Sequence, residues 1–234
     1  MIKTPATVRV FKGVCSAIAM VLMLSGCAVV DRFLGDLMHE EKSPAEIMAE
    51  GTQDLKEGNY ERAKESFQKI TDRYPYSKFA VEAELKMADA LYKSEAYEEA
   101  YDAYVEFEKL HPKNPNIPYV LYQRGMCHFE QVHTIDRDQS HTQMANTEFK
   151  RLVERFPKTV YADKARGKIR ECYIALADHE LYVGRYYYKQ GKYRAAMGRY
   201  RYLLDNYPDL GQYHEALEFL SRCKARLADE KGKP

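Results

Sequence analysis

The segment 60–75, which reads YERAKESFQKITDRYP, decides the fold because its pattern returns along the chain. Counted from Tyr60, a small residue stands at offset +3, an aromatic residue at +7 and a proline at +15. The same offsets recur from Tyr97 and Tyr193, and from Thr142 without the leading aromatic. Apolar residues three to four positions apart indicate an amphipathic helix. Since a proline disfavours helix in the residue before it, each copy is expected to be a helix that ends near its proline.

A small residue also stands nine positions before the start of three of the copies: Gly51, Ala88 and Gly184. A residue of that size lets a preceding helix approach the repeated helix closely, while the aromatic at +7 fills the space between neighbouring pairs. These offsets resemble the tetratricopeptide repeat (TPR), which is a helix–turn–helix unit. One pair cannot bury its apolar face alone, so we expect an all-α TPR superhelix of about five helix–turn–helix repeats.

The prolines that close the four copies are unevenly spaced, with intervals of 37, 45 and 51 residues. Two insertions account for this. One is the segment 133–141, which is expected as a loop between the two helices of the third repeat. The other lies between Pro157 and Gly191. The segment is long enough for one helix of about 30 residues or for two helices end to end. We count a degenerate fourth repeat there, and a kink in it would fall near Asp178.

The repeat region is therefore expected over residues 44–228. Residues 44–112 hold the N-terminal repeats, residues 113–157 the middle repeat with its inserted loop, and residues 158–228 the C-terminal repeats. A short tail at 229–234 follows.

The first 27 residues have the features of a lipoprotein signal. Three basic residues and no acidic ones accompany an apolar run of 11 residues at 14–24. As a helix this run is about 16 Å long, short of the roughly 30 Å hydrocarbon core of a bilayer, so it indicates a signal peptide at 1–26. It ends in LSGC at 24–27, which is similar to the lipobox of bacterial lipoproteins and predicts a lipid on Cys27. A plain secretory signal with an incidental cysteine is the alternative.

The residue after Cys27 is Ala28 rather than Asp. By resemblance to the sorting rules of proteobacterial lipoproteins, this predicts the outer membrane as the destination, with the protein held at the periplasmic face. Each buried CH₂ of an acyl chain contributes about 0.8 kcal/mol, so several chains make a stable anchor. Residues 27–43 are expected to be the lipidated cysteine and a tether. Apolar residues at helical spacing within it leave contact with lipid or a partner as the alternative.

Composition and motifs argue against catalysis and against nucleic acid as a ligand. The formal net charge of +1 provides no basic face for phosphates. The sequence contains no G-x-S-x-G, Walker A, H-E-x-x-H or G-x-G-x-x-G motif, so we expect neither an enzyme nor a cofactor. Cys127, Cys172 and Cys223 form no C-x-x-C pair and are expected to be small buried residues.

The inserted loop holds a polar cluster of His133, Asp136, Asp138 and His141. Such side chains can ligate a metal ion. Asp, Ser and Thr in loops equally bond to nearby backbone groups. We expect a hydrogen-bonded connector and no metal, with a metal site as the alternative.

The chain has 20 tyrosines and no tryptophan. Tyrosine joins a large apolar ring to a polar tip, which suits a groove for extended polypeptides, although most of these rings are expected in the repeat core. Tyr76 and Phe79 follow the first proline and are candidates for a peptide-binding groove. Tyr60 and Phe67 occupy the repeat offsets and are expected in the core.

The segment 114–125, NPNIPYVLYQRG, carries the most specific resemblance to a known family. It is similar to the segment H-P-N-I-x-Y-V-x-Y-x-R-G of the BamD family, with Asn114 in place of the usual His. The D-R-D at 136–138 resembles another element of that family, and R-Y-P at 73–75 also matches. Together with the lipobox and the repeats, the chain resembles this family of lipoproteins of the β-barrel assembly machinery up to about Leu220.

The resemblance implies a scaffold on the periplasmic side of the outer membrane. Family members bind the periplasmic domains of BamA through their C-terminal repeats, help to recognise unfolded outer-membrane proteins through their N-terminal repeats, and work with other Bam lipoproteins. Arg199 matches the arginine that faces BamA, and a guanidinium there pairs well with a carboxylate. Arg201 is the alternative contact, or both are simply solvated. Tyr119, Tyr122 and Arg124 match family positions and are expected to fix the third repeat.

Two other classes of protein share part of this pattern. A TPR lipoprotein of pilus or secretin assembly would have the lipobox and the repeats but would lack the N-I-x-Y element, which this chain has at 116–119. An envelope coordinator protein with similar repeats would lack the lipobox and would usually carry a coiled coil, and no heptad run is present.

Replacing Cys27 with Ser removes the thiol that would carry the lipid. We expect Cys27→Ser to move the protein from the membrane fraction to the soluble periplasmic fraction, because no acyl chain remains to hold it. Fractionation with immunoblotting measures this. A variant that stays in the membrane fraction would contradict the lipidation assignment.

Overall fold

The structure is a computed structural model that describes residues 41–208 and 210–231. The described residues from Pro44 onward form one compact unit. The predicted signal peptide, Cys27 and most of the predicted tether lie outside the described residues. The described fold is therefore that of this unit.

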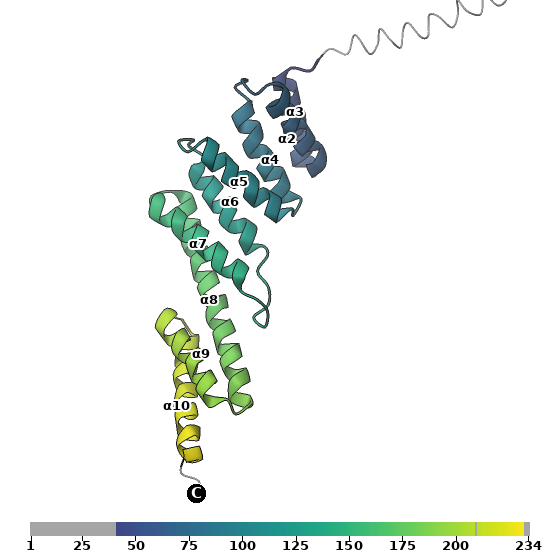
Figure 1. Cartoon of the computed structure of the whole chain (residues 1–234). Helices are drawn as coiled ribbons and strands as arrows, with labels where there is room; N and C mark the ends of the chain where they lie inside the picture. Colours follow the sequence, from purple (N-terminus) through teal and green to yellow (C-terminus); the bar gives the residue numbers. More distant parts are fainter. Residues whose placement is uncertain (1–40, 209, 232–234) are drawn as a thin grey trace, which may run out of the picture. The chain divides into compact units, whose positions relative to one another are not determined.

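Every regular element of the described residues is an α-helix, which confirms the all-α class. The repeat pattern marks the helix starts, since Tyr60, Tyr97 and Tyr193 are each the first residue of a helix and Thr142 lies two residues inside one. In chain order the helices are α2 (Pro44–Glu57), α3 (Tyr60–Arg73), α4 (Ala80–Lys93), α5 (Tyr97–Leu110), α6 (Ile117–Phe129), α7 (Ser140–Arg155), α8 (Val160–Lys189), α9 (Tyr193–Asn206) and α10 (Gln212–Lys231) (Figure 1).

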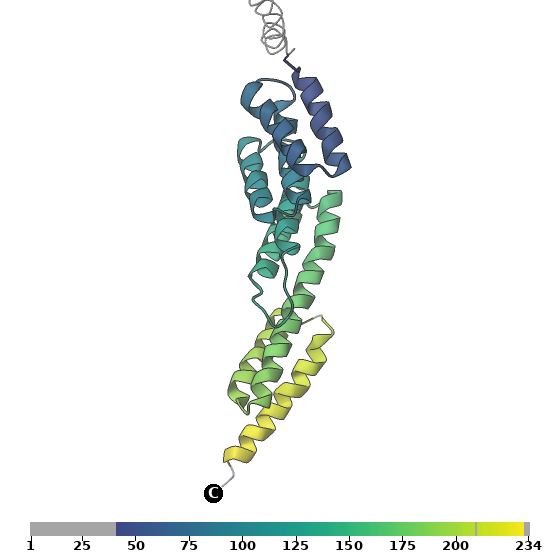
Figure 2. The same ribbon diagram turned by 90° about the vertical axis from the view of Figure 1, so that its right-hand side faces the viewer.

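Each helix packs mainly against the helices that precede and follow it in the chain (Figures 1 and 2). Three helix–turn–helix pairs, α2–α3, α4–α5 and α6–α7, stack in this order. The buried apolar residues fall into three clusters along the array, one in the first repeats, one in the middle and one at the C-terminal end. This pair-on-pair stacking with a segmented core is the architecture of a TPR superhelix and confirms the predicted fold.

The predicted degenerate repeat between Pro157 and Gly191 is wrong, because α8 is one continuous helix of 30 residues with no break near Asp178. Its first half contributes Ala165 and Cys172 to the middle core cluster, beside α6 and α7. Its second half contributes Leu176 and Leu181 to the C-terminal cluster, beside α9 and α10. A single rigid helix therefore joins two layers of the array, and no turn divides it into a separate degenerate repeat.

Close contact between a glycine and an aromatic ring recurs in three of the layers. A Cβ atom on Gly51 would lie 2.8 Å from Cε1 of Phe67, and a Cβ on Gly184 would overlap the buried ring of Tyr200. Gly125 stands against the ring of Phe149 in the same way. The nine-residue offset misses Gly125 because the inserted loop lengthens the separation between the two helices of that repeat. The glycine is therefore required for close approach of the paired helices.

The three cysteines of the repeat region are free and buried, as predicted. Burial raises the pKa of the Cys127 and Cys172 thiols to about 12, so both stay neutral at physiological pH. They act as small core residues.

Two glycines of α8 provide a matched test of the close approach. Gly184→Ala should lower the free energy of unfolding by about 1–2 kcal/mol, because the added methyl group displaces the Tyr200 ring in a packed core. Gly167→Ala should raise it by about 0.5–1 kcal/mol, because nothing lies within 4 Å of its Cβ position and alanine favours a helix. Urea unfolding followed by circular dichroism measures both. Stabilisation by both substitutions would show that the glycine–ring contact does not limit the packing.

Candidate partner-binding surfaces

A polar hollow of about 360 Å³ lies where the inserted loop meets α8 and α9. Asp136 and Arg137 come from the loop, Glu180 comes from α8, and Arg199 and Tyr202 come from α9. The fold thus brings the D-R-D element to Arg199, the arginine for which the family resemblance implies a partner contact, although some 60 residues separate them in the chain. Exposed arginine and tyrosine side chains at one concave site are typical of protein–protein contacts.

The loop has a defined conformation that its own side chains support. The buried Gln139 donates from Nε2 to the carbonyl oxygens of Thr134, at 3.2 Å, and Arg137, at 3.1 Å. A bond across 44 residues ties the loop to α8, because Nδ1 of His179 donates to the carbonyl oxygen of Ile135 at 2.6 Å. The loop is therefore fixed at the middle of α8, on the wall of the hollow.

The two aspartates of the D-R-D element accept hydrogen bonds within the loop. Asp136 accepts from Oγ1 of Thr134 at 2.5 Å, and Asp138 accepts from the backbone N–H of Ser140 at 2.9 Å. The hydrogen bond from the Thr134 side chain holds the pKa of Asp136 below its usual value, and the side chain and backbone N–H of Ser140 do the same for Asp138, so both are ionised. In the described part of the chain no group of three metal-ligating side chains converges. The bonding pattern fits the hydrogen-bonded connector.

An ion pair between α8 and α9 lines the hollow. Nη1 of Arg199 lies 3.3 Å from both carboxylate oxygens of Glu180. The Glu180 side chain is only 10% exposed, whereas that of Arg199 is 44% exposed. Arg199 therefore neutralises a nearly buried carboxylate with one nitrogen and presents the rest of its guanidinium to solvent. Glu180 and His179 are the site residues that the sequence analysis misses, and their only signal is a polar pair in the middle of a long helix.

Arg201 lies on a different face of α9 from Arg199. Two residues along an α-helix are separated by about 200° around its axis. Arg201 is exposed but does not line the hollow. A single concave site cannot use both arginines, so a role for Arg201 requires a partner that reaches around α9.

Two of the third-repeat residues that match family positions, Tyr119 and Arg124, bond within the fold. The buried Arg124 donates to Glu108 on α5 at 2.5 Å and to Glu148 on α7 at 2.6 Å. The hydroxyl of Tyr119 donates to Asp89 at 2.6 Å. These bonds join α4, α5, α6 and α7, so the N-I-x-Y segment fixes the geometry of the middle repeats.

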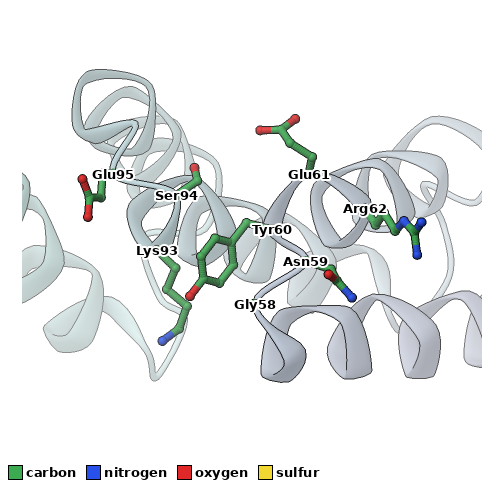
Figure 3. Close-up of a pocket in the computed structure, with 8 residues that line it drawn as sticks. All are labelled: Gly58, Asn59, Tyr60, Glu61, Arg62, Lys93, Ser94 and Glu95. Atoms are coloured by element: carbon green, nitrogen blue, oxygen red, sulfur yellow. The ribbon is translucent and has the colours of Figure 1, made fainter.

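A second hollow, of about 600 Å³, opens between two turns of the N-terminal repeats (Figure 3). Gly58 and Glu95 shape the two turns, with backbone φ angles of +83° and +64°. Tyr60 and Lys93 extend in the same direction in this view, and both line the hollow. The repeat offset places Tyr60 in the core, but its side chain is only half-buried and borders this open space. Its signal in the sequence is the Gly58 turn directly before it.

The two groove candidates chosen from the sequence differ in exposure. Tyr76 is fully exposed in the turn between α3 and α4. Phe79 is half-buried and packs against the core cluster of the first repeats, with Nζ of Lys78 at 5.1 Å from its ring centroid. Neither residue lines the hollow of Figure 3. Tyr76 is thus free to meet a ligand, whereas part of the Phe79 ring is already used by the fold.

Comparison with known proteins places the chain in a family. The family model described as YfiO, outer membrane lipoprotein, matches residues 40–233. Outer membrane protein assembly factor BamD of Caulobacter vibrioides is 31% identical over 213 residues, which cover 89% of this chain and 70% of the relative. BamD of Neisseria meningitidis serogroup A is 31% identical over 234 residues, which cover 95% and 86%. The chain belongs to the YfiO family of outer membrane lipoproteins.

Membership in the YfiO family confirms the BamD resemblance that segment 114–125 carries. The matched region includes both hollows and the inserted loop, while Cys27 lies before its first residue. None of the helices among the described residues combines the length and the apolar character that crossing a bilayer requires.

Proposed function

We propose that this member of the YfiO family is a non-catalytic scaffold of the β-barrel assembly machinery at the outer membrane. It binds the periplasmic domains of BamA through its C-terminal repeats and unfolded outer-membrane proteins through its N-terminal repeats, with accessory Bam lipoproteins as further partners. The name of the curated relatives, outer membrane protein assembly factor, supports the process. The observation that carries the BamA contact is the half-exposed Arg199 at the polar hollow.

The contact with BamA uses the unpaired side of the Arg199 guanidinium. Glu180 engages Nη1 only, so Nε and Nη2 remain for a carboxylate of the partner. A bidentate arginine–carboxylate pair is directional and short. Tyr202, nearly half exposed beside it, supplies an apolar ring of the kind that anchors interfaces. Arg201 is a second contact for a partner that extends around α9.

Capture of unfolded chains uses the N-terminal repeats. The hollow of Figure 3 offers the ring of Tyr60 and the ammonium group of Lys93, and Lys93 has no ion-pair partner among the described residues. An aromatic residue that ends a chain brings a ring and a free carboxylate together, which matches these two groups. Tyr76, fully exposed, and Phe79 extend the contact at the following turn.

A lipid on Cys27 would hold the scaffold at the periplasmic face of the outer membrane. Confinement to a membrane raises the effective concentration of a membrane-embedded partner without any new contact. Weak contacts at the two hollows then suffice for repeated cycles of capture and release.

Glu180 complicates the simplest test of Arg199, because a charge reversal there would also place a second carboxylate beside a nearly buried one. Two variants separate the two effects. Arg199→Gln should lower the free energy of unfolding by about 1–2 kcal/mol, since Glu180 loses its cation, and should raise the Kd for the BamA periplasmic domains at least about tenfold. The double variant Glu180→Gln with Arg199→Gln should recover the stability but not the binding. Urea unfolding and isothermal titration calorimetry measure the two quantities.

Two further variants complete this test. Glu180→Gln alone keeps Arg199 and should bind at least as well as the natural chain. Arg62→Gln, exposed in the N-terminal repeats, should change neither quantity. Recovery of full binding in the double variant would show that Arg199 serves only to neutralise Glu180.

Lys93 provides a test of chain capture that does not disturb the fold, because the side chain is exposed. Lys93→Ala should raise the Kd for a synthetic peptide of a C-terminal barrel strand that ends in Phe by about fivefold, since the carboxylate loses its cation. The amidated form of the peptide should bind the natural chain and the variant equally. Lys158→Ala, at an exposed turn in the middle of the array, is the control. Fluorescence anisotropy measures the affinity of each protein for each peptide. An equal loss of affinity for both peptides in Lys93→Ala would rule out the carboxylate contact.

A further inference from the structure

We infer that the inserted loop is half of the C-terminal binding site, with Arg137 as a second cation that acts together with Arg199. The inference rests on the proposed BamA contact and names what that site recognises: an acidic protein segment that carries two carboxylates. The loop, α8 and α9 line one hollow, and Arg137 and Arg199 both border it.

The hydrogen-bonding capacity of the hollow points to an anionic ligand. Three carboxylates line it, and each already has an internal donor. Asp136 is bonded by Thr134, Asp138 by the N–H of Ser140, and Glu180 by Arg199 (donor–acceptor distances of 2.5, 2.9 and 3.3 Å). The guanidinium groups differ. Arg137 is exposed and has no ion-pair partner among the described residues, and Arg199 uses only Nη1. The site therefore has unused N–H donors on two guanidinium groups, and carboxylates are the strongest acceptors for such donors.

Geometry rather than bulk charge selects the ligand. Three carboxylates and two guanidinium groups nearly cancel, so the hollow has no strong net field to attract acidic chains in general. A ligand gains binding free energy only when its carboxylates lie beside both arginines and away from the three aspartate and glutamate side chains. This arrangement rejects most acidic segments by placing like charge near them.

His179 is a positioning residue for this site. Its Nδ1–H holds the carbonyl of Ile135, two residues before Arg137, against α8 at 2.6 Å. The bonds from Gln139 to Thr134 and to the Arg137 carbonyl stiffen the same turn. The Arg137 backbone is thus fixed relative to Arg199 before any partner arrives, which reduces the entropy lost on binding.

The experiment compares Arg137→Ala with Arg170→Ala in the full-length chain, using the BamA periplasmic domains as the probe. Both arginines are exposed and make no ion pair among the described residues, and only Arg137 borders the hollow. We expect Arg137→Ala to raise the Kd about tenfold and Arg170→Ala to leave it unchanged, with equal urea midpoints for both. Arg137→Glu should raise the Kd further.

The outcomes separate this inference from the proposed function. If Arg199→Gln weakens binding and Arg137→Ala does not, the loop is not part of the site and the inference fails while the BamA contact stands. If substitutions of Arg137 and of Arg199 both leave binding unchanged, the inference and the proposed BamA contact both fail. One shared ligand segment predicts that Arg199→Gln and Arg137→Ala each weaken binding. It also predicts that the change in binding free energy of the double variant differs from the sum of the two single changes.

His179 is tested by its own pair of variants. His179→Ala should raise the Kd and speed amide hydrogen exchange over residues 135–137, because the loop is released from α8. His179→Gln retains an N–H donor and should recover part of both effects. Faster exchange without any change in the Kd would assign His179 a purely structural role and overturn its place in the binding site.

Discussion

Close approach between a small residue on one helix and an aromatic ring on the next is the contact on which the array depends. Gly184 against Tyr200 and Gly125 against Phe149 set how near the paired helices lie. Each ring is fully buried and fills the space between layers. Since no helix pair closes a core alone, the contact repeats at every layer or the apolar faces remain in water. The separation of the paired helices, and with it the relative placement of the side chains that they carry, follows from this contact.

The polar hollow depends on the length of α8. Its 30 residues span two core clusters, so the second half of the helix runs past α7 and carries His179 and Glu180 beyond the layer in which the helix begins. The inserted loop lies against this extended part and is bonded there through Ile135. A regular array with a turn in the middle of α8 would separate the loop from α9. The irregular spacing of the repeats therefore creates the polar hollow.

The repeated pattern was sufficient to predict the fold, because the offsets of Ala and Phe or Tyr report directly on which residues are buried. The pattern also predicts the first residues of α3, α5 and α9, which are the aromatic residues that begin the copies. The hollows were harder to predict. Tyr60 has a core offset yet borders open space, because a glycine turn with positive φ precedes it. The pairing of Arg199 with Glu180 depends on how α8 crosses α9, and the loop contact with His179 spans 44 residues. Neither the Arg199–Glu180 ion pair nor the loop contact with His179 can be predicted from the spacing of residues within one helix.

The ion pair at the hollow connects folding with recognition. A nearly buried carboxylate is costly without a cation, so Glu180 fixes the position of Arg199 whether or not a partner is present. The same carboxylate weakens the attraction of Arg199 for a second anion, since part of its charge is already compensated. The binding free energy of a partner carboxylate must therefore come from directional hydrogen bonds to the guanidinium and from a second contact, rather than from charge alone. A neighbouring guanidinium on a rigid loop supplies such a contact, and this is why a site with almost balanced charge can still be selective.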